Sequence, residues 1–401
     1  MGVNITYMGT KRVLAPIVND VLGHAQAGTM LDAFAGMCSV GEAVGQSRHV
    51  WNNDIQVFAS EVARALFTSR EGPMSPLACG DLYFDDFKSQ RDRLVRHFER
   101  SVAVEQELQA VEFFAKLESH NAKFERILAK EVAVCRVRSP HLFATTYSGT
   151  FFGIRQSIEA DSIVAAMKIA RRSGRIGPDD YRWGIIALGR ALLKIANSTG
   201  HFAQYLTPKA TNYRRYIRLR KRSVWAEWLS SIALLSPLGA ADWRRGNRVF
   251  RQDALTLIPK LALKNSEISV IYADPPYTDD QYSRFYHVLE TLCLYDYPTV
   301  TGAGLYRKDR FRTPFSLISE APSSILSLIE ASARTGADLV LSYPSEGLAI
   351  KAGADVGRML RKNFKRVEMC RSMSHKHSTF GASKGSAHAD ATEMIYLARS
   401  A

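Results

Sequence analysis

Residues 268–277 have the sequence Ile268-Ser269-Val270-Ile271-Tyr272-Ala273-Asp274-Pro275-Pro276-Tyr277, an apolar run that ends in a carboxylate, two prolines and an aromatic ring. The apolar run is typical of a buried strand. In open α/β sheets, ligands bind at the carboxyl ends of such strands. The prolines fix two backbone φ angles and have no N–H to donate, so neighbouring carbonyl groups are free to face a ligand. The stretch therefore predicts a strand of an α/β sheet that ends in a rigid binding platform.

The chemistry of this platform suits a flat base that carries an amino group. Tyr277 can stack on the base, while the Asp274 carboxylate and the Pro275 carbonyl accept the two amino hydrogens. We therefore predict that Asp274, Pro275, Pro276 and Tyr277 are the catalytic residues. A simple Asp-Pro turn after a strand is the alternative interpretation, because proline pairs are common in loops.

The composition indicates a folded protein with a polyanionic partner. The chain has 401 residues, of which 46% are hydrophobic, and this is long enough for two or more domains. It contains no run of 18 apolar residues and no signal sequence, so we expect a cytoplasmic protein without a membrane partner. The five cysteines are scattered without metal spacing, which predicts no bound metal. The net charge of +14 favours nucleic acid, although many basic proteins bind none.

An α/β pattern occupies both ends of the chain and a helical pattern occupies its middle. Near the start, strands are expected at 28–34 and 49–53. Residues 89–134 predict one or two long amphipathic helices, and helical patterns continue to about 197. Further strands are expected at 248–251, 268–273, 338–343, 366–370 and 392–398. We therefore predict an α/β domain formed by 1–87 and 246–401, interrupted by a mainly helical insertion over 88–245.

The last part of this insertion mixes basic and aromatic residues. Residues 209–251 contain eleven Lys or Arg against two acids, with three tryptophans and two tyrosines between them. Such mixing suits a nucleic-acid-binding face. A solvated basic helix beside ordinary core tryptophans is the alternative.

Several turns supply candidates for a cofactor pocket. Asp32 and Gly36 lie in a small-residue turn after the first strand, where the backbone can approach a ligand closely. Asp54 ends the next strand, about 20 residues further on, at the usual offset for a carboxylate that binds ribose hydroxyls. Asp253 precedes a helix and suits either an adenine amino group or a simple N-cap. Lys11 lies at a helix start, where the helix dipole disfavours a cation, so an anionic ligand is expected beside it unless it is merely a solvated surface residue.

These pieces, in this order, resemble the Dam-type, or α-group, adenine-N6 DNA methyltransferases, which use S-adenosylmethionine. The resemblance covers about half of the chain. It rests on Tyr7-Met8-Gly9-Thr10-Lys11, Asp32-Ala33-Phe34-Ala35-Gly36, Asn53-Asp54, the long insertion, Asp253 and Asp274-Pro275-Pro276-Tyr277. One departure is Cys38, which stands where the family's F-x-G-x-G pattern has its second glycine. Residues 281–290 are similar to a branch found with restriction or phage-defence systems.

The resemblance implies a Rossmann-like methyltransferase sheet and a function. The enzyme is expected to transfer a methyl group from S-adenosylmethionine to the N6 amino group of an adenine flipped out of double-stranded DNA. The cofactor-binding residues are expected to be Tyr7, Gly9, Lys11, Asp32, Phe34, Gly36, Asp54 and Asp253. Two alternatives stay open, namely an RNA adenine-N6 methyltransferase and a non-catalytic DNA-binding protein that keeps the fold. Restriction or defence proteins are expected partners, and the sequence leaves the oligomeric state open.

Two groups of arginines are predicted to contact nucleic acid. One lies in the basic run of the insertion and the other in a loop after the platform. Their members are Arg214, Arg215, Arg218, Arg222, Arg307, Arg310 and Arg312. Phosphate contacts of this kind position DNA without specifying its sequence.

Overall fold

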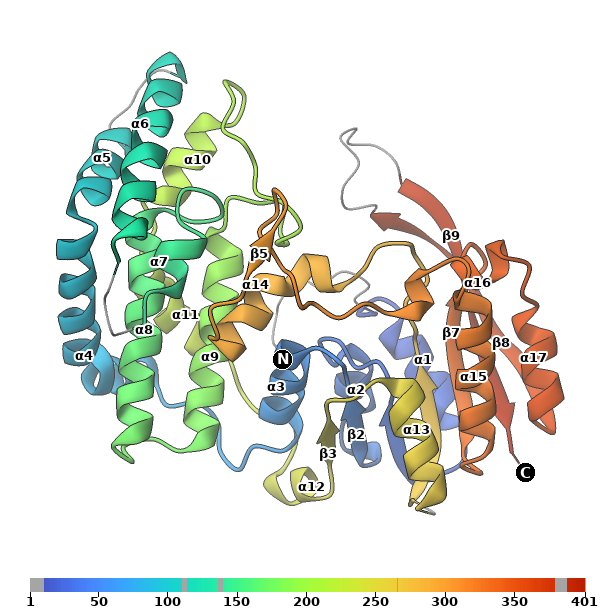
Figure 1. Cartoon of the computed structure of the whole chain (residues 1–401). Coiled ribbons are helices and arrows are strands. Elements are labelled where there is room, and N and C mark those ends of the chain that lie inside the picture. The colour runs from blue at the N-terminus through green and yellow to red at the C-terminus, as the bar shows by residue number, and fades with distance from the viewer. Residues whose placement is uncertain (1–10, 110–113, 136–139, 265, 379–387, 401) are drawn as a thin grey trace.

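The protein is built around one mixed sheet of seven strands. The structure is a computed structural model, and it describes residues 11–109, 114–135, 140–264, 266–378 and 388–400. The strands follow the order β3-β2-β1-β4-β7-β9-β8 across the sheet (Figure 1). Their bounds are β1 (Thr29–Asp32), β2 (Val50–Asn53), β3 (Arg248–Phe250), β4 (Ile268–Ala273), β7 (Asp338–Pro344), β8 (Arg366–Ser378) and β9 (His388–Arg399). Neighbouring strands from β3 to β7 are parallel, and β9 is antiparallel to both β7 and β8. The predicted α/β, Rossmann-like fold is confirmed.

The order of the strands creates a crevice beside β1. The chain moves outward in one direction from β1 through β2 to β3, and then returns to place β4 on the other side of β1. The loops that leave β1 and β4 therefore diverge, and such a switch point is where open α/β sheets bind their ligands. The turn after β1 and the platform after β4 consequently lie at the same edge of the sheet.

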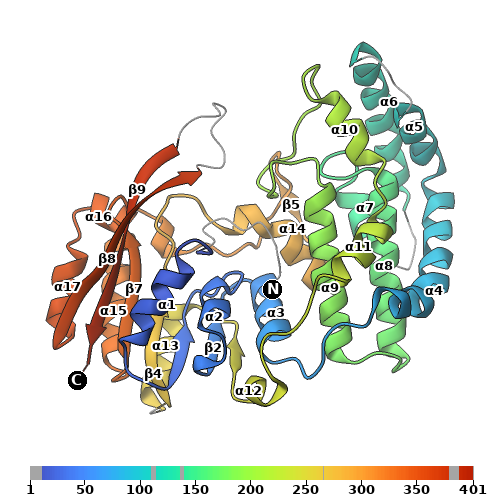
Figure 2. The ribbon, with the colours of Figure 1, turned by 180° about the vertical axis from the view of Figure 1, so that it is seen from behind.

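Both faces of the sheet are buried, which explains why its strands are continuous apolar runs. Met30, Val50 and Val270 belong to one core, while their neighbours Leu31 and Ile271 belong to the other. The first face is covered by α1 (Ala15–Gly23), α2 (Ser39–Val44) and α3 (Val57–Phe67). The second face is covered by α13 (Ala254–Leu263), α15 (Ala321–Ala333) and α17 (Val356–Asn363). Figures 1 and 2 show α13 and α15 on one side of the sheet and α1 on the other.

A helical part lies to one side of the sheet, and in sequence it falls between α3 and β3 (Figure 1). It contains α4 (Pro76–His97), α5 (Glu99–Gln109), α6 (Phe114–Ala133), α7 (Leu142–Thr146), α8 (Ile154–Arg172), α9 (Pro178–Ile195), α10 (Tyr213–Arg220), α11 (Val224–Ile232) and α12 (Ala241–Arg245). The predicted boundary between residues 87 and 88 needs correction, because it falls inside α4. This helix begins at Pro76, where the Ser75 hydroxyl accepts a hydrogen bond from the backbone N–H of Ala78. Residues 89–134, which were expected to form one or two helices, belong to three helices, α4, α5 and α6.

Most of this helical part shares its core with the sheet. A single cluster of buried side chains runs from the sheet through Phe58 on α3 to Ile163 on α8, Ile186 on α9 and Trp228 on α11. A smaller, separate cluster joins α5, α6 and α10 to the end of α4. The helices nearest the sheet therefore form one packed body with it, whereas α5, α6 and α10 form an outer group.

Buried carboxylates from distant segments hold several helix N-termini. Glu290, on α14 (Ser283–Leu294), accepts hydrogen bonds from the first two N–H groups of α3. Asp161 on α8 accepts hydrogen bonds from the N–H groups of Phe143 and Ala144 in α7. Glu105 on α5 accepts them from the first two N–H groups of α8. These N–H groups have no partner within their own helix, and a negative charge there also complements the helix dipole.

The remaining elements are short. A hairpin of β5 (Val300–Thr301) and β6 (Tyr306–Arg307) follows α14, and α16 (Leu348–Lys351) follows β7. Single turns of 3-10 helix occur at Gly45–Ser47 and Pro314–Ser316. No helix of the described segments is long and apolar enough to cross a membrane.

Candidate active site

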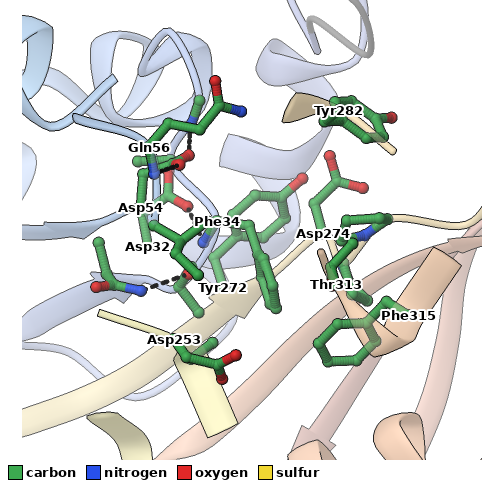
Figure 3. Close-up of a pocket in the computed structure, with 18 of the residues that line it drawn as sticks. Asp32, Phe34, Asp54, Gln56, Asp253, Tyr272, Asp274, Tyr282, Thr313 and Phe315 are labelled. Carbon is green, nitrogen blue, oxygen red and sulfur yellow. Dashed lines mark hydrogen bonds between the residues drawn. The ribbon is translucent and has the colours of Figure 1, made fainter. Parts of the chain in front are cut away.

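A pocket opens at the switch point of the sheet, between the loops that follow β1, β2, β3 and β4. Among the residues that the structure describes, four aspartates and one lysine are the charged residues that line it, namely Asp32, Asp54, Asp253, Asp274 and Lys11. Figure 3 shows Asp32, Asp54 and Asp253 on one side of this pocket and Asp274 on the other, with Phe34 and Tyr272 between them. The pocket thus brings together residues that are widely separated in the sequence, and its acidic excess suits a positively charged ligand.

The turn after β1 is held in an unusual backbone conformation. Gly36 has φ of 49° and Cys38 has φ of 63°, so both lie in the left-handed region. Glycine is the residue that normally occupies this region. Cys38 therefore keeps the backbone geometry expected of the glycine that it replaces. This finding answers the question that the departure from F-x-G-x-G raised.

Asp54 ties this turn to the end of β2. One of its carboxylate oxygens accepts the backbone N–H of Gly36 at 2.9 Å, and the other accepts that of Gln56 at 2.8 Å. Each carboxylate oxygen has a second lone pair, so a ligand hydroxyl can still donate to Asp54. Burial raises the pKa of Asp54 to about 6, although these N–H groups oppose the shift.

Asp32 and Asp253 have different surroundings in the same pocket. Asp32 is 1% exposed, and burial together with the charges of Asp274 and Asp54 raises its pKa to about 8. Asp253 caps α13, because its carboxylate accepts the N–H of Leu255 at 2.7 Å. It also lines the pocket, so the N-cap role and a ligand role are compatible for this residue.

The platform after β4 is held by a buried ion-pair network. Lys11 Nζ lies 3.0 Å from Asp274 Oδ1 and 2.8 Å from Glu393 Oε1. Burial disfavours the charge of Lys11, but the two carboxylates outweigh burial and raise its pKa. Burial and Glu393 raise the pKa of Asp274 to about 7, against the opposing effect of Lys11. Lys11 is 7% exposed, so the idea that it is a solvated surface residue is wrong.

The other platform residues also face the pocket. Pro275, Pro276 and Tyr277 line it, and the backbone carbonyl of Tyr277 accepts the N–H of Leu348 at 3.0 Å. Lys11 Nζ lies 5.4 Å from the centre of the Tyr277 ring. The backbone of Tyr277 is thus anchored to the start of α16, and its ring lies beside a cation.

Sequence reasoning missed several residues of this pocket. Gln56, Tyr282, Thr313 and Phe315 line it, and Glu393 lies beneath it with a fully buried side chain. Tyr282 is close enough to the platform in sequence to have been suspected. Glu393 carries no such signal, because it lies on β9, 382 residues from Lys11.

Two of the predicted cofactor residues, Tyr7 and Gly9, lie outside the described part of the chain. Phe34 and Gly36 line the pocket together with the aspartates. Glu290 does not line this pocket and caps α3, as described above.

The predicted DNA-contacting arginines fall into two classes. Arg214 and Arg218 are exposed on α10. Arg215 instead donates to the carbonyl of Ser198, and Arg222 forms an ion pair with Glu227.

The loop arginines differ in the same way. Arg307 is 4% exposed and is held by Asp296 and Asp309, so the expectation that it grips phosphate needs correction. Its two carboxylate partners neutralise it and fix the hairpin. Arg310 and Arg312 have no carboxylate partner within the described residues.

The walls of the pocket fit S-adenosylmethionine in chemical character. Apolar side chains such as Phe34, Val40 and Ala254 offer surface for an adenine ring. Carboxylates suit ribose hydroxyls and a cationic centre. The pocket also continues to the platform, so a bound cofactor and a base held there would share one cavity.

Comparison with known proteins agrees with this geometry. The chain matches the family model "D12 class N6 adenine-specific DNA methyltransferase" over residues 7–150 and 252–340, which is more than half of its length. It is 23% identical over 349 residues to the type II methyltransferase M.FokI of Planomicrobium okeanokoites, covering 86% of this chain and 45% of that protein. It is 21% identical over 346 residues to the modification methylase StsI of Streptococcus sanguinis, covering 85% of this chain and 44% of that protein. It is 22% identical over 320 residues to the modification methylase LlaI of Lactococcus lactis subsp. lactis, covering 79% of this chain and 42% of that protein. The chain thus spans less than half the length of these curated relatives.

Proposed function

Because this chain belongs to the D12 class of N6 adenine-specific DNA methyltransferases, we propose that it transfers a methyl group from S-adenosylmethionine to the N6 amino group of an adenine in double-stranded DNA. One observation carries the proposal. The Asp274-Pro275-Pro276-Tyr277 platform faces the same acidic pocket as the turn after β1. RNA methylation is not favoured, because the matched family is DNA-specific by its description. A purely binding role is not favoured either, because the platform is intact.

The acidic side of the pocket would hold the cofactor. S-adenosylmethionine supplies a methyl group bound to a positively charged sulfur. Asp54 would accept hydrogen bonds from the ribose hydroxyls, and Asp253 from the adenine amino group. Phe34 and Gly36 would form the wall between them, with Asp32 beneath. Tyr7, Gly9 and Lys11 stay predicted cofactor contacts.

The platform would hold the target base. The lone pair of an adenine amino group is delocalised into the ring, so the nitrogen is a poor nucleophile. Asp274 and the Pro275 carbonyl would accept its two hydrogens and favour a more nucleophilic geometry. The bound cofactor would supply the methyl group, and the nitrogen would give up one proton once it carries that group. Asp274 would take this proton, since its pKa of about 7 suits proton transfer near neutral pH.

The target adenine would have to leave the DNA helix to reach this platform. Flipping a base out of a duplex costs a few kcal/mol in lost stacking and pairing. Tyr277 would recover part of this cost, because stacking on an aromatic ring contributes about 1–3 kcal/mol per base. The remaining contribution to the rate comes from placing the two reacting atoms in line.

A transfer assay on three variants tests this function. The wild type should move tritiated methyl groups to duplex DNA and not to RNA of the same sequence. Asp274→Ala and Asp274→Asn should lose at least about 100-fold in rate, as expected for removing a group that acts in the transition state. Asp253→Asn should keep the rate at saturating cofactor and raise the cofactor KM. Near-wild-type turnover of Asp274→Ala would sink the catalytic assignment.

The relatives named above are a type II methyltransferase and modification methylases. We propose by analogy that this chain modifies DNA in a restriction-modification context. Plasmid DNA from cells that express it should resist at least one endonuclease of a panel. A plasmid from cells that express Asp274→Ala should be cut by the same endonuclease.

A further inference from the structure

We propose that Arg284, Arg310 and Arg312 form a phosphate clamp that grips the DNA backbone next to the flipped adenine. The inference rests on the function proposed above and names three residues that hold the substrate. We call Arg284, Arg310 and Arg312 the arginine cluster.

A single tyrosine organises two members of the cluster. The guanidinium carbon of Arg284 lies 5.5 Å from the centre of the Tyr306 ring, and that of Arg310 lies 5.4 Å from the same centre. Tyr306 is itself fixed, since its hydroxyl donates to the carbonyl of Ala203 and its ring packs edge-on against His287. The two cations are therefore held close together on one rigid aromatic support.

The positive charge of the cluster is poorly compensated. The pKa of Arg310 is lowered, first by burial and then by the charges of Arg312 and Arg284. In the described segments, the only ion pair of Arg284 is a long contact of 3.8 Å to Asp280. Three cations that repel one another are costly to hold together, and a bound anion would relieve that cost.

A buried donor in the cluster lacks a partner. Arg310 Nη1 is shielded from solvent and makes no hydrogen bond to any described residue. A buried donor without an acceptor costs about 1–3 kcal/mol, and more when it is charged. A phosphate oxygen would supply the acceptor, because the planar guanidinium fork matches phosphate geometry.

The loop that carries Arg310 and Arg312 lies at the mouth of the active site. Phe311 and Thr313, which flank Arg312 in sequence, both line the pocket with Asp274. Thr313 is labelled beside the platform in Figure 3. Arg310 and Phe311 also line a neighbouring cavity that shares Asp253 and Gln252 with the pocket. A base on the platform would place its sugar and phosphates at this mouth.

Hydrogen bonds fasten the loop of the cluster to the segment that follows the platform. The side chain of Gln281 donates to the carbonyl of Thr313 at 3.2 Å and accepts its N–H at 2.9 Å. The hydroxyl of Ser283 donates to the carbonyl of Phe311 at 2.8 Å. The arginines are thus pre-positioned relative to Asp274, which favours a clamp that loses little conformational entropy on binding.

The clamp explains how the flipped state is kept. An extrahelical base is held by its base contacts and by its backbone, which must be bent at the flanking phosphates. Contacts between the arginine cluster and those phosphates would stabilise the flipped state more than the undistorted duplex. Arg307, whose charge is taken up by Asp296 and Asp309, stays outside the cluster.

The first experiment measures binding to a duplex of arbitrary sequence, which does not require activity. Arg284→Gln/Arg312→Gln is compared with Arg245→Gln/Arg358→Gln, a control that removes the same charge from exposed sites on α12 and α17. Removing one phosphate-binding cation lowers the salt slope of duplex binding by about 0.9, so the slope of the cluster variant should fall by about 1.8. The control should keep the wild-type slope. A wild-type slope in the cluster variant overturns the proposal.

The second experiment locates the grip. The methylated sequence is first mapped by sequencing plasmid DNA from cells that express the wild type. A duplex with 2-aminopurine at the target adenine then reports flipping by its fluorescence. At saturating protein, the cluster variant should flip a smaller fraction than the control, and a mismatch opposite the target should restore most of the flipping. If the cluster variant has a lower salt slope but flips as large a fraction of the target base as the control, the arginines bind DNA without stabilising the flipped state. That result would also overturn the clamp.

Two outcomes separate this proposal from the proposed function. If the wild type methylates DNA while the cluster variant behaves like the control, only the clamp fails. If the wild type transfers no methyl group, the function fails, whereas the salt slope still tests the cluster as a DNA contact. Arg310→Lys supplies a variant that keeps the charge and removes the fork, and it should flip less than the wild type at an unchanged overall charge.

Discussion

The aspartates of the pocket differ in how readily they ionise, and this difference shapes the response to pH. Burial raises both pKa values, that of Asp54 to about 6 and that of Asp32 to about 8. Backbone N–H groups oppose the shift of Asp54, whereas the charges of Asp274 and Asp54 add to that of Asp32. At neutral pH, Asp54 is mostly ionised and Asp32 is mostly protonated. The pocket therefore gains negative charge in steps as the pH rises.

Cofactor affinity should follow the ionisation of Asp54. A protonated Asp54 is a weaker acceptor for ribose hydroxyls and no longer attracts a cationic ligand. Binding of S-adenosylmethionine should therefore weaken below pH 6, by up to about tenfold per pH unit if only the ionised form binds. Calorimetry between pH 5 and 8 measures this dependence.

The variant Asp54→Asn is the matched control for that prediction. It should bind the cofactor at least about tenfold more weakly at pH 7.5, because a hydrogen bond to a charged group contributes about 1.5–3 kcal/mol. It should also lose the step in affinity near pH 6. A wild-type profile in Asp54→Asn would remove Asp54 from the ribose site.

Glu393 and Lys11 should shift the pH profile of the reaction in opposite directions. Glu393→Gln removes a negative charge from the network, so Asp274 should ionise more easily and the acid limb of kcat/KM should move to lower pH. Lys11→Met removes the cation, so the same limb should move to higher pH and the rate should fall. Circular dichroism checks that both variants fold. Shifts in the same direction would contradict the network described here.

At the scale of elements, helices are joined to one another by carboxylates that cap them from a distance. The link between α14 and α3 is the one nearest the site, because α14 follows the platform and α3 follows the strand that carries Asp54. Its hydrogen bonds measure 2.9 Å to the N–H of Val57 and 2.7 Å to that of Phe58. Glu290 thereby fixes the two halves of the pocket relative to each other.

Removing this link should destabilise the protein. Glu290→Ala leaves two buried N–H groups without an acceptor and should lower the free energy of unfolding by about 2 kcal/mol, within the usual range of 1–3 kcal/mol. Urea denaturation measures the change. Glu118→Ala, on the exposed side of α6, makes the same chemical change and should stay within about 0.5 kcal/mol of the wild type. Equal effects of the two variants would refute the capping role.

Elements were predictable where a local pattern specified them. The runs at 268–273 and 338–343 are apolar because both sheet faces are buried, and strands formed there as β4 and β7. The start of α4 was missed although a signal was present, since Ser75-Pro76 combines an N-cap residue with a proline at the first helical position.

At the scale of the whole molecule, the helical part offers the exposed basic residues Arg214 and Arg218 on α10. This helix belongs to the outer group with α5 and α6, beyond the core that is shared with the sheet (Figure 1). Duplex DNA held at the pocket would need support over a wider surface than the mouth alone. We therefore keep these two arginines as predicted phosphate contacts.

The double variant Arg214→Gln/Arg218→Gln tests this wider surface. It should lower the salt slope of DNA binding by about 1.8 and weaken binding to many sequences alike. Cofactor affinity should not change, because both residues lie outside the pocket. Arg215 and Arg222 are left unchanged, since their hydrogen bonds are structural. A wild-type salt slope in this double variant would show that Arg214 and Arg218 do not contact phosphates, and would leave the arginine cluster as the predicted phosphate contact.

The site could be predicted from sequence only in part, and distance along the chain explains the remainder. The platform and Asp32 stood out because each follows an apolar strand. The partners of Lys11 did not, because the order of strands in the sheet brings them together. Tyr306 did not stand out either, because it belongs to a two-residue strand outside that sheet and its role depends on contacts with α14.

The pairing of Lys11 with Glu393 has a consequence for biogenesis. At about 5–20 residues per second, the ribosome needs roughly 20–80 s to travel the 382 residues between them. During that time the emerging lysine lacks one of its two carboxylate partners, and the ion-pair network behind the platform is incomplete. A message truncated before the last strand would yield a protein that carries every recognisable motif and still lacks a finished catalytic centre. The ion-pair network behind the platform is thus complete only after β9 has been synthesised.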